Sequence, residues 1–477
     1  WAIQEMGYEA IIINSNPETV STDFSISDKL YFEPLTFEDV MNVIDIEKPI
    51  GVIAQFGGQT ALNLVEPLLE QGVNILGTSS ENINAAEDRK LFEKLLKDLD
   101  INQPKGQTIR SLEAALETAN TLKYPVLIRP SFVLGGRAME IIYNDQDLKK
   151  YVLEALETSE HPILIDKYLQ GKECEVDALC DGERVLIPGI MEHIEAAGVH
   201  SGDSMAVYPP YSIDKKMQDL IYEYTKKIAL GLNVIGVVNI QFIIFDNNLY
   251  VIEVNPRGSR TLPFLSKITK LNIAKIATNI MLGKSLKDQN LEGGIYPHAK
   301  LTHVKAPVFS FTKLSEMKIQ LSPEMKSTGE VMGSDLSLSK AIYKTFLASG
   351  TKIPELGGKV FLDCATHDKD RALEVISRCS NLGFDIFIKP SLKKALEDSL
   401  NNFEVYTLEP KELTTDFAMI ACVDTTQKIK DSLKTCQFSL IHQIPLFTSF
   451  DTLKAILDVI EWKNPMTLSI QDSLFDI

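Results

Sequence analysis

The side chains best suited to chemistry lie in one short stretch, Gln241 to Arg260, which reads QFIIFDNNLYVIEVNPRGSR. Residues 239–245 and 249–255 have the apolar composition of buried strands, and the DNN between them consists of residues that tolerate turn conformations. The stretch therefore predicts a β-hairpin. On this hairpin and just after it stand a carboxylate, several amides and two guanidinium groups.

The length of the hairpin loop decides where these side chains point. A two-residue turn at the two asparagines would leave Gln241 and Glu253 on opposite faces of the sheet, because side chains alternate along a strand. A three-residue loop, 246–248, would pair Gln241 with Glu253 and Asn239 with Asn255 on one face. We expect the three-residue loop, which gathers the oxygen ligands.

A cluster of hard oxygens with few protein ligands suits Mg²⁺, which keeps waters and is usually completed by substrate phosphates. The candidate ligands are Gln241, Glu253 and Asn255. Arg257 and Arg260 follow at once, where guanidinium groups can hold an anionic co-substrate and stabilise a transferred phosphoryl group. The alternative is a solvated strand end, and the neighbouring motifs decide between the two.

Length and composition bound the possibilities. A chain of 477 residues is too long for one core and should form two or three domains. The net charge of −17, with no basic run, argues against nucleic acid as a partner. The six cysteines show no C-x-x-C spacing, which fits a reducing cytoplasm. The longest apolar run, 234–245, is too short for a membrane span and no signal peptide is seen, so we expect a soluble protein.

The N-terminal part alternates predicted strands and helices, which indicates a small parallel α/β unit. The expected segments are a strand at 10–13, a helix at 37–44, a strand at 51–55, a helix from Thr60 and a strand at 73–76. Loops 14–23 and 56–60 follow strands, at the edge where ligands bind in open α/β sheets, or they are plain turns. The sequence opens with Trp1 inside an apparent helix, and we interpret it as a fragment.

After a predicted helix over 85–99, a predicted strand over 124–128 runs into Arg129 and then into Gly135 and Gly136. Glycines let a backbone approach phosphate oxygens. No Gly-Lys-Ser/Thr follows, so this is not a P-loop. We interpret it as a flexible flap over a triphosphate, with Arg129 as a phosphate ligand.

Three acids, Glu173, Glu175 and Asp177, alternate at a period of two and therefore share one face of a strand. They follow residues 163–169, an apolar segment suited to lining an adenine slot. The acidic face either accepts hydrogen bonds from ribose hydroxyls or is simply solvated. The next loop, MEHIEAAGVHSGDS at 191–204, contains two histidines that are either structural or functional.

The order of strand, glycine flap, adenine segment, acidic strand and ligand hairpin resembles an ATP-grasp domain. In detail, YPVLIRPSFVLGGRAMEI, MEHIEAAGVHSGDS, IEVNPRGSRTLPFLSK and STGEVMGSD, with the upstream NPETVSTD and IAQFGGQT, resemble the second half of the large subunit of carbamoyl phosphate synthetase. The resemblance implies an α/β chain of three parts: a pre-ATP-grasp, Rossmann-like unit at 1–79, an ATP-grasp domain at 80–350, and a small regulatory-type, methylglyoxal-synthase-like α/β domain at 351–477.

The resemblance further implies transfer of the γ-phosphoryl group of ATP to carbamate, a reaction catalysed mostly by positioning and charge neutralisation. Gln241, Glu253 and Asn255 would hold two Mg²⁺ or Mn²⁺ ions, with K⁺ allowed as a further cation. Arg257 and Arg260 would orient carbamate and the transferred group. The implied nucleotide ligands are Arg129, Lys167, Leu169, Glu173, His200, Gln241 and Glu253, with backbone contacts from Gly198, Val199 and Ser201; Lys167 is the weakest, because its position varies in this family.

The implied partners lie outside this sequence. The family makes carbamate with a glutaminase subunit and a first ATP-grasp half, and its product feeds arginine and pyrimidine biosynthesis. Ornithine activates some members through acids that match Glu195 and Asp203. That effector role and the ordinary alternative, solvated or paired acids, both stay open.

After residue 351 the α/β pattern restarts, with strands expected at 359–363, 384–388 and 417–422 and helices at 370–382 and 392–400. Family members that bind uridine or inosine monophosphate here use a turn rich in Thr and Gly after the second strand. This chain has Lys389, Pro390 and Ser391 there, and no glycine from residue 384 to the end. Proline has no N–H to donate, so we expect weak or absent nucleotide feedback.

Two other classes compete with carbamate phosphorylation. A carboxylate–amine ligase or a biotin carboxylase would share the fold and the hairpin, but the NPETVSTD and EHIEAAGVHSGDS runs argue against it. A non-enzymatic nucleotide-binding regulatory module would not need two arginines beside metal ligands.

Overall fold

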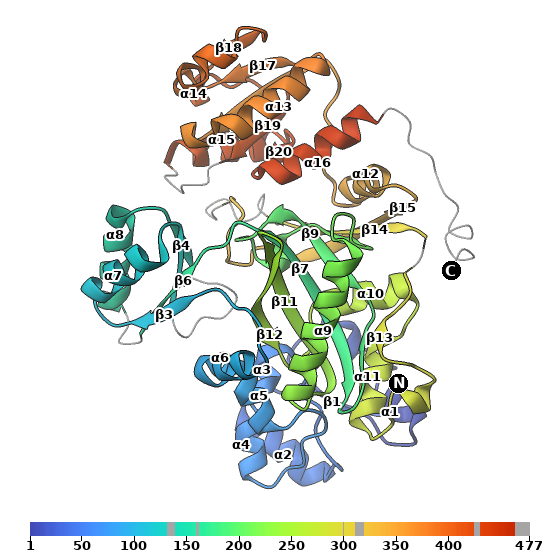
Figure 1. Cartoon of the computed structure of the whole chain (residues 1–477). Coiled ribbons are helices and arrows are strands. Elements are labelled where there is room, and N and C mark those ends of the chain that lie inside the picture. Colours follow the sequence, from blue (N-terminus) through green and yellow to red (C-terminus); the bar gives the residue numbers. More distant parts are fainter. Residues whose placement is uncertain (131–138, 159–161, 299, 311–318, 424–429, 463–477) are drawn as a thin grey trace. The chain divides into compact units, whose positions relative to one another are not determined.

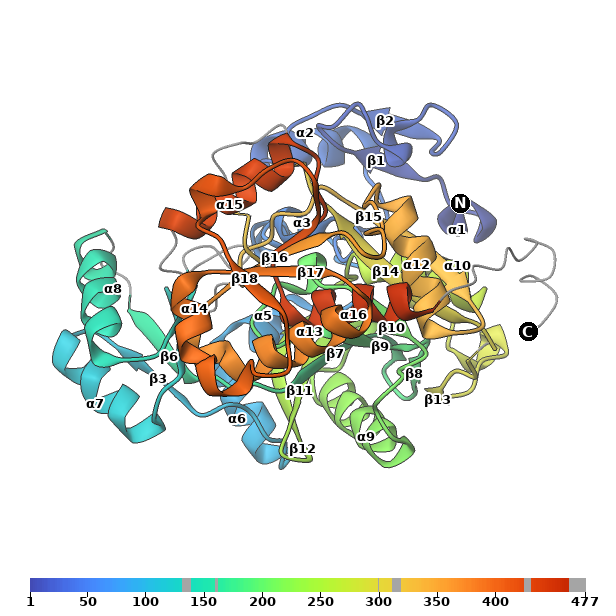
Figure 2. The same ribbon diagram turned by 90° about the horizontal axis from the view of Figure 1, so that it is seen from above.

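The computed structural model describes residues 1–130, 139–158, 162–298, 300–310, 319–423 and 430–462 (Figures 1 and 2). It divides into two compact units. Unit 1 comprises residues 1–103, 174–191 and 212–299, and unit 2 comprises residues 104–173, 192–211 and 300–477. The segments 1–79, 80–350 and 351–477 stay our prediction of how the sequence is organised into domains.

The N-terminal part of unit 1 is built from short elements. Strand β1 (Ile11–Ile13) pairs in parallel with β2 (Lys29–Tyr31). The segments expected as strands near 51–55 and 73–76 meet only through a single parallel bridge between Val52 and Ile75. The helices of this part are α1 (Ala2–Glu5), α2 (Phe37–Glu47), α3 (Gly58–Leu62), α4 (Val65–Glu70), α5 (Ser80–Glu87) and α6 (Arg89–Asp98).

The single helix expected over 85–99 is wrong. Asp88 has extended backbone between α5 and α6, and its carboxylate accepts a hydrogen bond from the backbone N–H of Leu91 at 2.9 Å. An aspartate in this position caps a new helix start. The apolar stripe of α6 is nevertheless as expected, because Phe92 and Leu96 are buried.

The sheet of unit 1 contains the predicted hairpin. Strands β11 (Ile235–Phe245) and β12 (Asn248–Asn255) form an antiparallel hairpin, and the strand order is β12–β11–β7, with β7 spanning Lys172–Asp181. Strand β8 (Val185–Ile187) pairs with β7, and β13 (Gly294–Ile295) pairs with β8. Helix α9 (Lys215–Gly231) shares the apolar core of this sheet, and α10 (Thr261–Thr269) and α11 (Ile273–Met281) follow the hairpin.

Unit 2 contains a four-stranded antiparallel sheet in the order β3–β6–β4–β5. Its strands are β3 (Gly106–Ile109), β4 (Val126–Pro130), β5 (Glu140–Ile142) and β6 (Ile163–Lys167), and its helices are α7 (Leu112–Leu122) and α8 (Asp145–Thr158). Four further strands of unit 2, which belong to the nine-stranded sheet that also contains β12, β11 and β7, follow the antiparallel order β9–β10–β14–β15. These strands are β9 (Ile190–Ala196), β10 (Ala206–Tyr208), β14 (Thr302–Val308) and β15 (Gly329–Asp335), and α12 (Leu338–Ala348) packs on β14 and β15.

The C-terminal part of unit 2 is a parallel sheet in the order β18–β17–β16–β19–β20. Its elements are β16 (Lys359–Cys364), α13 (Lys369–Asn381), β17 (Asp385–Ile388), α14 (Pro390–Ala395), β18 (Val405–Thr407), β19 (Phe417–Val423), α15 (Lys430–Ile441), β20 (Leu446–Phe447) and α16 (Phe450–Glu461). The expected strands and the first expected helix are confirmed within one or two residues. The second, expected at 392–400, begins earlier because Pro390 starts α14 as its first residue, and it ends earlier, at Ala395, before the 3₁₀ helix Glu397–Ser399.

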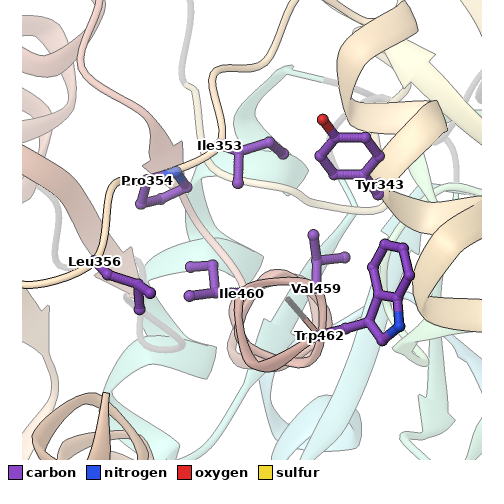
Figure 3. A pocket seen from close by; sticks show the side chains of 7 residues that line it. All are labelled: Tyr343, Ile353, Pro354, Leu356, Val459, Ile460 and Trp462. Atoms are coloured by element: carbon purple, nitrogen blue, oxygen red, sulfur yellow. The ribbon is translucent and has the colours of Figure 1, made fainter. Parts of the chain in front are cut away.

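Helices α12, α13 and α16 contribute to one apolar core on this sheet. A small apolar cavity of about 140 Å³ lies beside α12 and α16, lined by Tyr343, Ile353, Pro354, Leu356, Val459, Ile460 and Trp462 (Figure 3). None of the predicted site residues lines it. Short 3₁₀ helices occur at Val20–Thr22, Ser201–Asp203, Lys287–Gln289, Thr366–Asp368, Glu397–Ser399 and Pro410–Glu412. Within the described ranges, no helix is long and apolar enough to cross a membrane.

Candidate active site

The hairpin of β11 and β12 turns through two residues, not three. Phe245 lies opposite Asn248, and the turn residues Asp246 and Asn247 have positive φ angles of 48° and 58°. Two left-handed residues in succession are typical of the tight turn whose twist matches that of a β-hairpin. The expected three-residue loop at 246–248 is therefore wrong.

A β-bulge nevertheless restores the predicted register. Phe242 lies opposite Val251, but the next residue of β11, Gln241, lies opposite Glu253, so that Ile252 has no counterpart. One extra residue on one strand moves every later pair by one position. Residues directly opposite each other in an antiparallel pair share a face, so Gln241 and Glu253 lie side by side as predicted.

Asparagines continue this face toward the end of the hairpin. Asn239 lies opposite Asn255, and the Asn255 amide donates to Oδ1 of Asn239 at 3.5 Å. Arg257 donates to Oδ1 of Asn255 at 3.3 Å. The row of oxygen ligands is thus linked directly to the first arginine.

The chemistry of this face fits a magnesium site in part. Glu253 is exposed, Gln241 and Asn255 are half-buried, and the three together offer one carboxylate and two amides. In the described part of the chain, no group of three or more His, Cys, Asp or Glu side chains is arranged to hold a metal. A metal bound here would therefore depend on a single acid and on ligands from a substrate, which is the pattern Mg²⁺ uses with phosphates.

The loop from Pro256 to Thr261 carries both arginines and is held at several points. The Gln55 side chain donates to the carbonyl of Pro256 at 3.0 Å, and the backbone carbonyl of Gln55 accepts from the N–H of Gly258 at 3.1 Å. Arg257 donates to the carbonyl of Gly258 at 3.3 Å, and its buried Nε has no hydrogen-bond partner among the described residues. One donor of this guanidinium is therefore available for an anion.

Two acids of the alternating strand also hold this loop. Asp177 accepts from the backbone N–H and the hydroxyl of Ser259, and Glu175 accepts from the hydroxyl of Thr261. These carboxylates are 0% and 2% exposed, so the alternative of a solvated face is wrong for both. Their described partners are protein groups, not positions open to a ribose.

Gln55, Ser259 and Thr261 are site residues that were not predicted from the sequence. The only available signal was local. Gln55 is the polar residue that ends the apolar segment before the FGG turn, and Ser259 and Thr261 flank Arg260.

The predicted nucleotide ligands of unit 2 lie on or near the four-stranded sheet. Arg129 on β4 has its Nε 3.4 Å from Oδ2 of Asp166 on the adjacent β6. Lys167 donates to the backbone carbonyl of Lys123 at 2.8 Å, and burial, together with the neighbouring Lys123 charge, lowers the pKa of Lys167. Leu169 is buried. The flap glycines Gly135 and Gly136 lie outside the described residues.

Glu173 is brought together with the histidine loop. Its carboxylate accepts from the backbone N–H of Gly198 at 3.3 Å and lies 3.4 Å from Nδ1 of His193. Gly198 has φ +103°, and a Cβ there would lie 2.8 Å from the Tyr168 hydroxyl oxygen, so this position requires glycine. Tyr168 also donates a short hydrogen bond to the carbonyl of Ala197, and burial raises the pKa of its hydroxyl.

The other residues of this loop that were predicted to contact the nucleotide come directly after Gly198 in the sequence. Val199 and His200 lead into the 3₁₀ helix that begins at Ser201. The His200 ring caps this helix, because its Nδ1 accepts from the N–H of Gly202 at 3.0 Å. The Nδ1 of His200 therefore has a local structural role.

The two acids named for an effector role are already occupied. Glu195, 3% exposed, accepts from the hydroxyls of Ser204 and Thr452 at 2.6 and 2.8 Å, and burial raises its pKa. Asp203, 1% exposed, accepts from the backbone N–H groups of residues 326 and 327. These contacts support the alternative of paired acids, and activation by ornithine stays a prediction.

Lys389, in the turn after β17 of the C-terminal sheet, is also paired with a protein group. The Lys389 ammonium lies 2.6 Å from Oδ1 of Asp363, whose side chain is 3% exposed. A lysine neutralised in this way is a poor ligand for a phosphate. This pairing agrees with the expected loss of nucleotide feedback.

The mixed α/β fold defines the class of protein, because it is the fold of ATP-grasp proteins such as biotin carboxylase. Biotin carboxylase from Campylobacter jejuni, solved as a β-γ-ATP complex, is 18% identical and matches 73% of this chain and 86% of its own, with a TM-score of 0.59. N5-carboxyaminoimidazole ribonucleotide synthetase from Thermotoga maritima is 14% identical and matches 73% and 93%, with a TM-score of 0.54. At these identities the likeness shows the fold alone.

Matches to two protein-family models identify the family. Residues 88–289 match the carbamoyl-phosphate synthase L chain, ATP binding domain, and residues 1–85 match the carbamoyl phosphate synthase preATP-grasp domain. The chain belongs to the carbamoyl phosphate synthase large-chain family. Neither match extends past residue 289.

Proposed function

We propose that this chain transfers the γ-phosphoryl group of ATP to carbamate. A carbamate oxygen forms a bond to the γ-phosphorus, the bond from that phosphorus to the β–γ bridging oxygen breaks, and ADP leaves with the electron pair. The products are carbamoyl phosphate and ADP. This is the second phosphoryl transfer of glutamine-dependent carbamoyl phosphate synthesis, which corresponds to the second half of the large subunit.

The observation that carries this proposal is the bulged register of the hairpin. It sets Gln241 beside Glu253 on the face that ends in Asn255, and Arg257 is hydrogen-bonded to Asn255. Phosphoryl transfer needs charge stabilisation and in-line positioning more than it needs an acid or a base. A row of oxygen ligands followed by two guanidinium groups supplies both.

Arg257 and Arg260 are assigned to the anionic groups. The unpartnered Nε of Arg257 offers a donor for carbamate or for the transferred phosphoryl oxygens. Guanidinium groups suit this task because they donate in a fixed fork and keep their charge. Asn255 orients Arg257 through its amide oxygen.

Gln241, Glu253 and Asn255 would hold two Mg²⁺ ions, with Mn²⁺ as the alternative metal and K⁺ as a further cation. When bound, the ions would neutralise the phosphate charge of the nucleotide. One carboxylate and two amides are a suitable protein contribution for ions whose remaining ligands are phosphate oxygens and water.

The nucleotide is assigned to the ligands that the family resemblance implies. The proposed ligands are Arg129, Lys167, Leu169, Glu173, Gly198, Val199, His200 and Ser201, together with Gln241 and Glu253. The contact between Glu173 and the Gly198 N–H supports grouping the acid with the loop. Lys167 is the least supported, because its ammonium already donates to a backbone carbonyl.

The proposed partners are the source of carbamate: a glutaminase subunit and a first ATP-grasp half. We assign the product to arginine and pyrimidine biosynthesis and the protein to the cytoplasm. Residues 351–477 are proposed as a regulatory-type domain that has kept its packing role.

The test is formation of ATP from ADP and carbamoyl phosphate by the purified chain with Mg²⁺. We expect ATP formation that depends on both substrates and that falls strongly in Arg257→Ala. A wild-type chain that binds ADP but forms no ATP from carbamoyl phosphate, alone or with its proposed partners, would reject the proposal and favour a nucleotide-binding module.

The similarity to biotin carboxylases favours one alternative, a biotin-carboxylase-like reaction. The biotin carboxylase domain of 2-oxoglutarate carboxylase from Hydrogenobacter thermophilus, solved with MgADP, ADP and bicarbonate, has a TM-score of 0.58 at 17% identity over 73% of this chain and 85% of its own. Bicarbonate-dependent carboxylation of free biotin distinguishes the two reactions. Carboxylated biotin, without ATP formation from carbamoyl phosphate, would replace our proposal with this alternative.

A further inference from the structure

We propose that Asp177 and Glu175 are positioning residues. They fix the loop from Pro256 to Thr261, here called the arginine loop, for phosphoryl transfer. This inference rests on the proposed function, because it assigns a task to Arg257 and Arg260. Both acids lie in β7, and the loop they hold begins where β12 ends.

Asp177 makes the tighter attachment. Oδ1 accepts from the backbone N–H of Ser259 at 3.0 Å, and Oδ2 accepts from the Ser259 hydroxyl at 2.5 Å. Hydrogen bonds to an ionised acceptor are shorter and stronger than those between neutral groups. Both oxygens of one carboxylate thus hold the residue that precedes Arg260.

Glu175 holds the other side of Arg260. Oε1 accepts from the Thr261 hydroxyl at 2.6 Å, at the first residue of α10. Oε2 accepts from the amide of Asn239 at 3.4 Å. Arg260 therefore lies between two residues that are each tied to a buried acid of the same strand.

The same contacts connect the loop to the proposed metal ligands. Glu175 contacts Asn239, Asn239 contacts Asn255, and Asn255 accepts from Arg257. A shift of the loop would therefore move both arginines relative to the ligand face. Displacement of a reacting group by about 1 Å can cost about 100-fold in rate.

Burial of two acids calls for an explanation beyond packing. Asp177 and Glu175 are 0% and 2% exposed, and carboxylates are costly to remove from water unless they are well hydrogen-bonded. Apolar residues would fill the same space at lower cost. The acids instead accept hydrogen bonds from polar groups that flank Arg260. Such bonds are expected where buried acids hold this arginine in position.

The test uses Asp177→Asn and Glu175→Gln, which keep the size of each side chain, in the full chain with its partners. We expect kcat for ATP formation from ADP and carbamoyl phosphate to fall about 10- to 100-fold, with KM for ADP changed less than about twofold. Thr261→Ser should retain the rate and Thr261→Val should lose it, because only serine keeps the hydroxyl.

Asp181→Asn is the matched control. Asp181 lies on the same strand, and its carboxylate accepts from the backbone N–H of Leu286 at 2.8 Å, outside the arginine loop. Its substitution should leave kcat within about twofold of wild type even where the melting temperature falls. Equal loss of kcat in Asp177→Asn and Asp181→Asn would overturn the proposal in favour of a general structural effect.

A second readout does not depend on turnover. Hydrogen exchange of the Ser259 amide should be faster in Asp177→Asn than in wild type and unchanged in Asp181→Asn. Unchanged exchange and unchanged kcat in Asp177→Asn would overturn the proposal. A wild-type chain inactive with carbamoyl phosphate would reject the proposed function instead, and the Ser259 exchange rate would still decide whether Asp177 holds the loop.

Discussion

Replacement of Gln55 by methionine should destabilise unit 1 and slow the reaction together. The Gln55 side chain is 2% exposed and donates to the carbonyls of Val237 and Pro256 at 3.1 and 3.0 Å. Its Oε1 accepts from the N–H of Thr78 at 3.1 Å. One carboxamide thus links the N-terminal segment to β11 and to the arginine loop.

The size of the effect follows from these contacts. Methionine keeps the length and volume of glutamine but neither donates nor accepts comparably, so three buried backbone groups lose a partner. Each such loss costs about 1 kcal/mol or more, which gives about 3 kcal/mol in the free energy of unfolding. Because Pro256 directly precedes Arg257, we also expect kcat to fall by about 10-fold.

The assay is urea denaturation of the full chain, with ATP formation measured in the same preparations. Gln59→Met is the control, since the hydrogen bonds of Gln59 to Asn63 and Glu87 lie at the surface. Substitutions of that kind usually change stability by less than about 0.5 kcal/mol. Gly77→Ala should reproduce the Gln55 effect, because a Cβ at Gly77 would lie 2.2 Å from Oε1 of Gln55.

A loss of unfolding free energy below about 1 kcal/mol in Gln55→Met, or one equal to that of Gln59→Met, would refute the reasoning. It would mean that the carbonyls find other donors. A normal kcat despite a clear loss of stability would show that the loop is placed without Gln55.

Three further predictions concern other parts of the chain. Glu253→Gln should lower the rate of ATP formation by about 100-fold or more without changing the melting temperature, because it removes ligand charge from an exposed side chain; unchanged turnover would exclude the metal role. Burial lowers the pKa of His303 from 6.5 to about 4, so the unfolded chain binds a proton at His303 before the folded chain does as the pH falls. The free energy of unfolding is therefore about 3 kcal/mol higher above pH 6.5, and this difference is lost as the pH falls to about 4. Urea denaturation between these pH values should show this loss in wild type and not in His303→Gln. Uridine and inosine monophosphates should bind the full chain no tighter than about millimolar by calorimetry, because Lys389 is paired with Asp363; micromolar binding coupled to a change in ATP affinity would contradict this.

Local patterns predicted much of the fold. The hairpin, β16, β17 and β19 lie where their apolar composition placed them, and α2 begins at Phe37 as the pattern predicted. The break between α5 and α6 at Asp88 was missed because the local pattern does not show it. An aspartate inside an apolar stripe reads as one more exposed helical residue, and only its bond to the N–H of Leu91 shows it to be a cap.

The register of the site was right for a wrong reason. Each residue of the DNN tolerates positive φ, so composition did not distinguish a turn of two residues from a loop of three. Ile252, the extra residue of the bulge, is apolar like its neighbours and carries no signal of its own. The prediction held because the bulge at Ile252 shifts the register by one residue, as the longer loop would have done.

The alternating acids of β7 show a second limit of local patterns. Alternation at a period of two tells which residues share a face, but not what covers that face. Asp177 and Glu175 find their partners 82 and 86 residues further along the chain, beyond any local window. The residues between the acids are themselves buried, as Val176 shows at 0% exposed, so both faces of this strand are covered. A covered acidic face must be fully hydrogen-bonded, and here the donors are the hydroxyls and the N–H that flank Arg260. Among the three acids first considered for ribose, Glu173 alone therefore remains a candidate for the nucleotide, and the other two belong to the placement of the arginines.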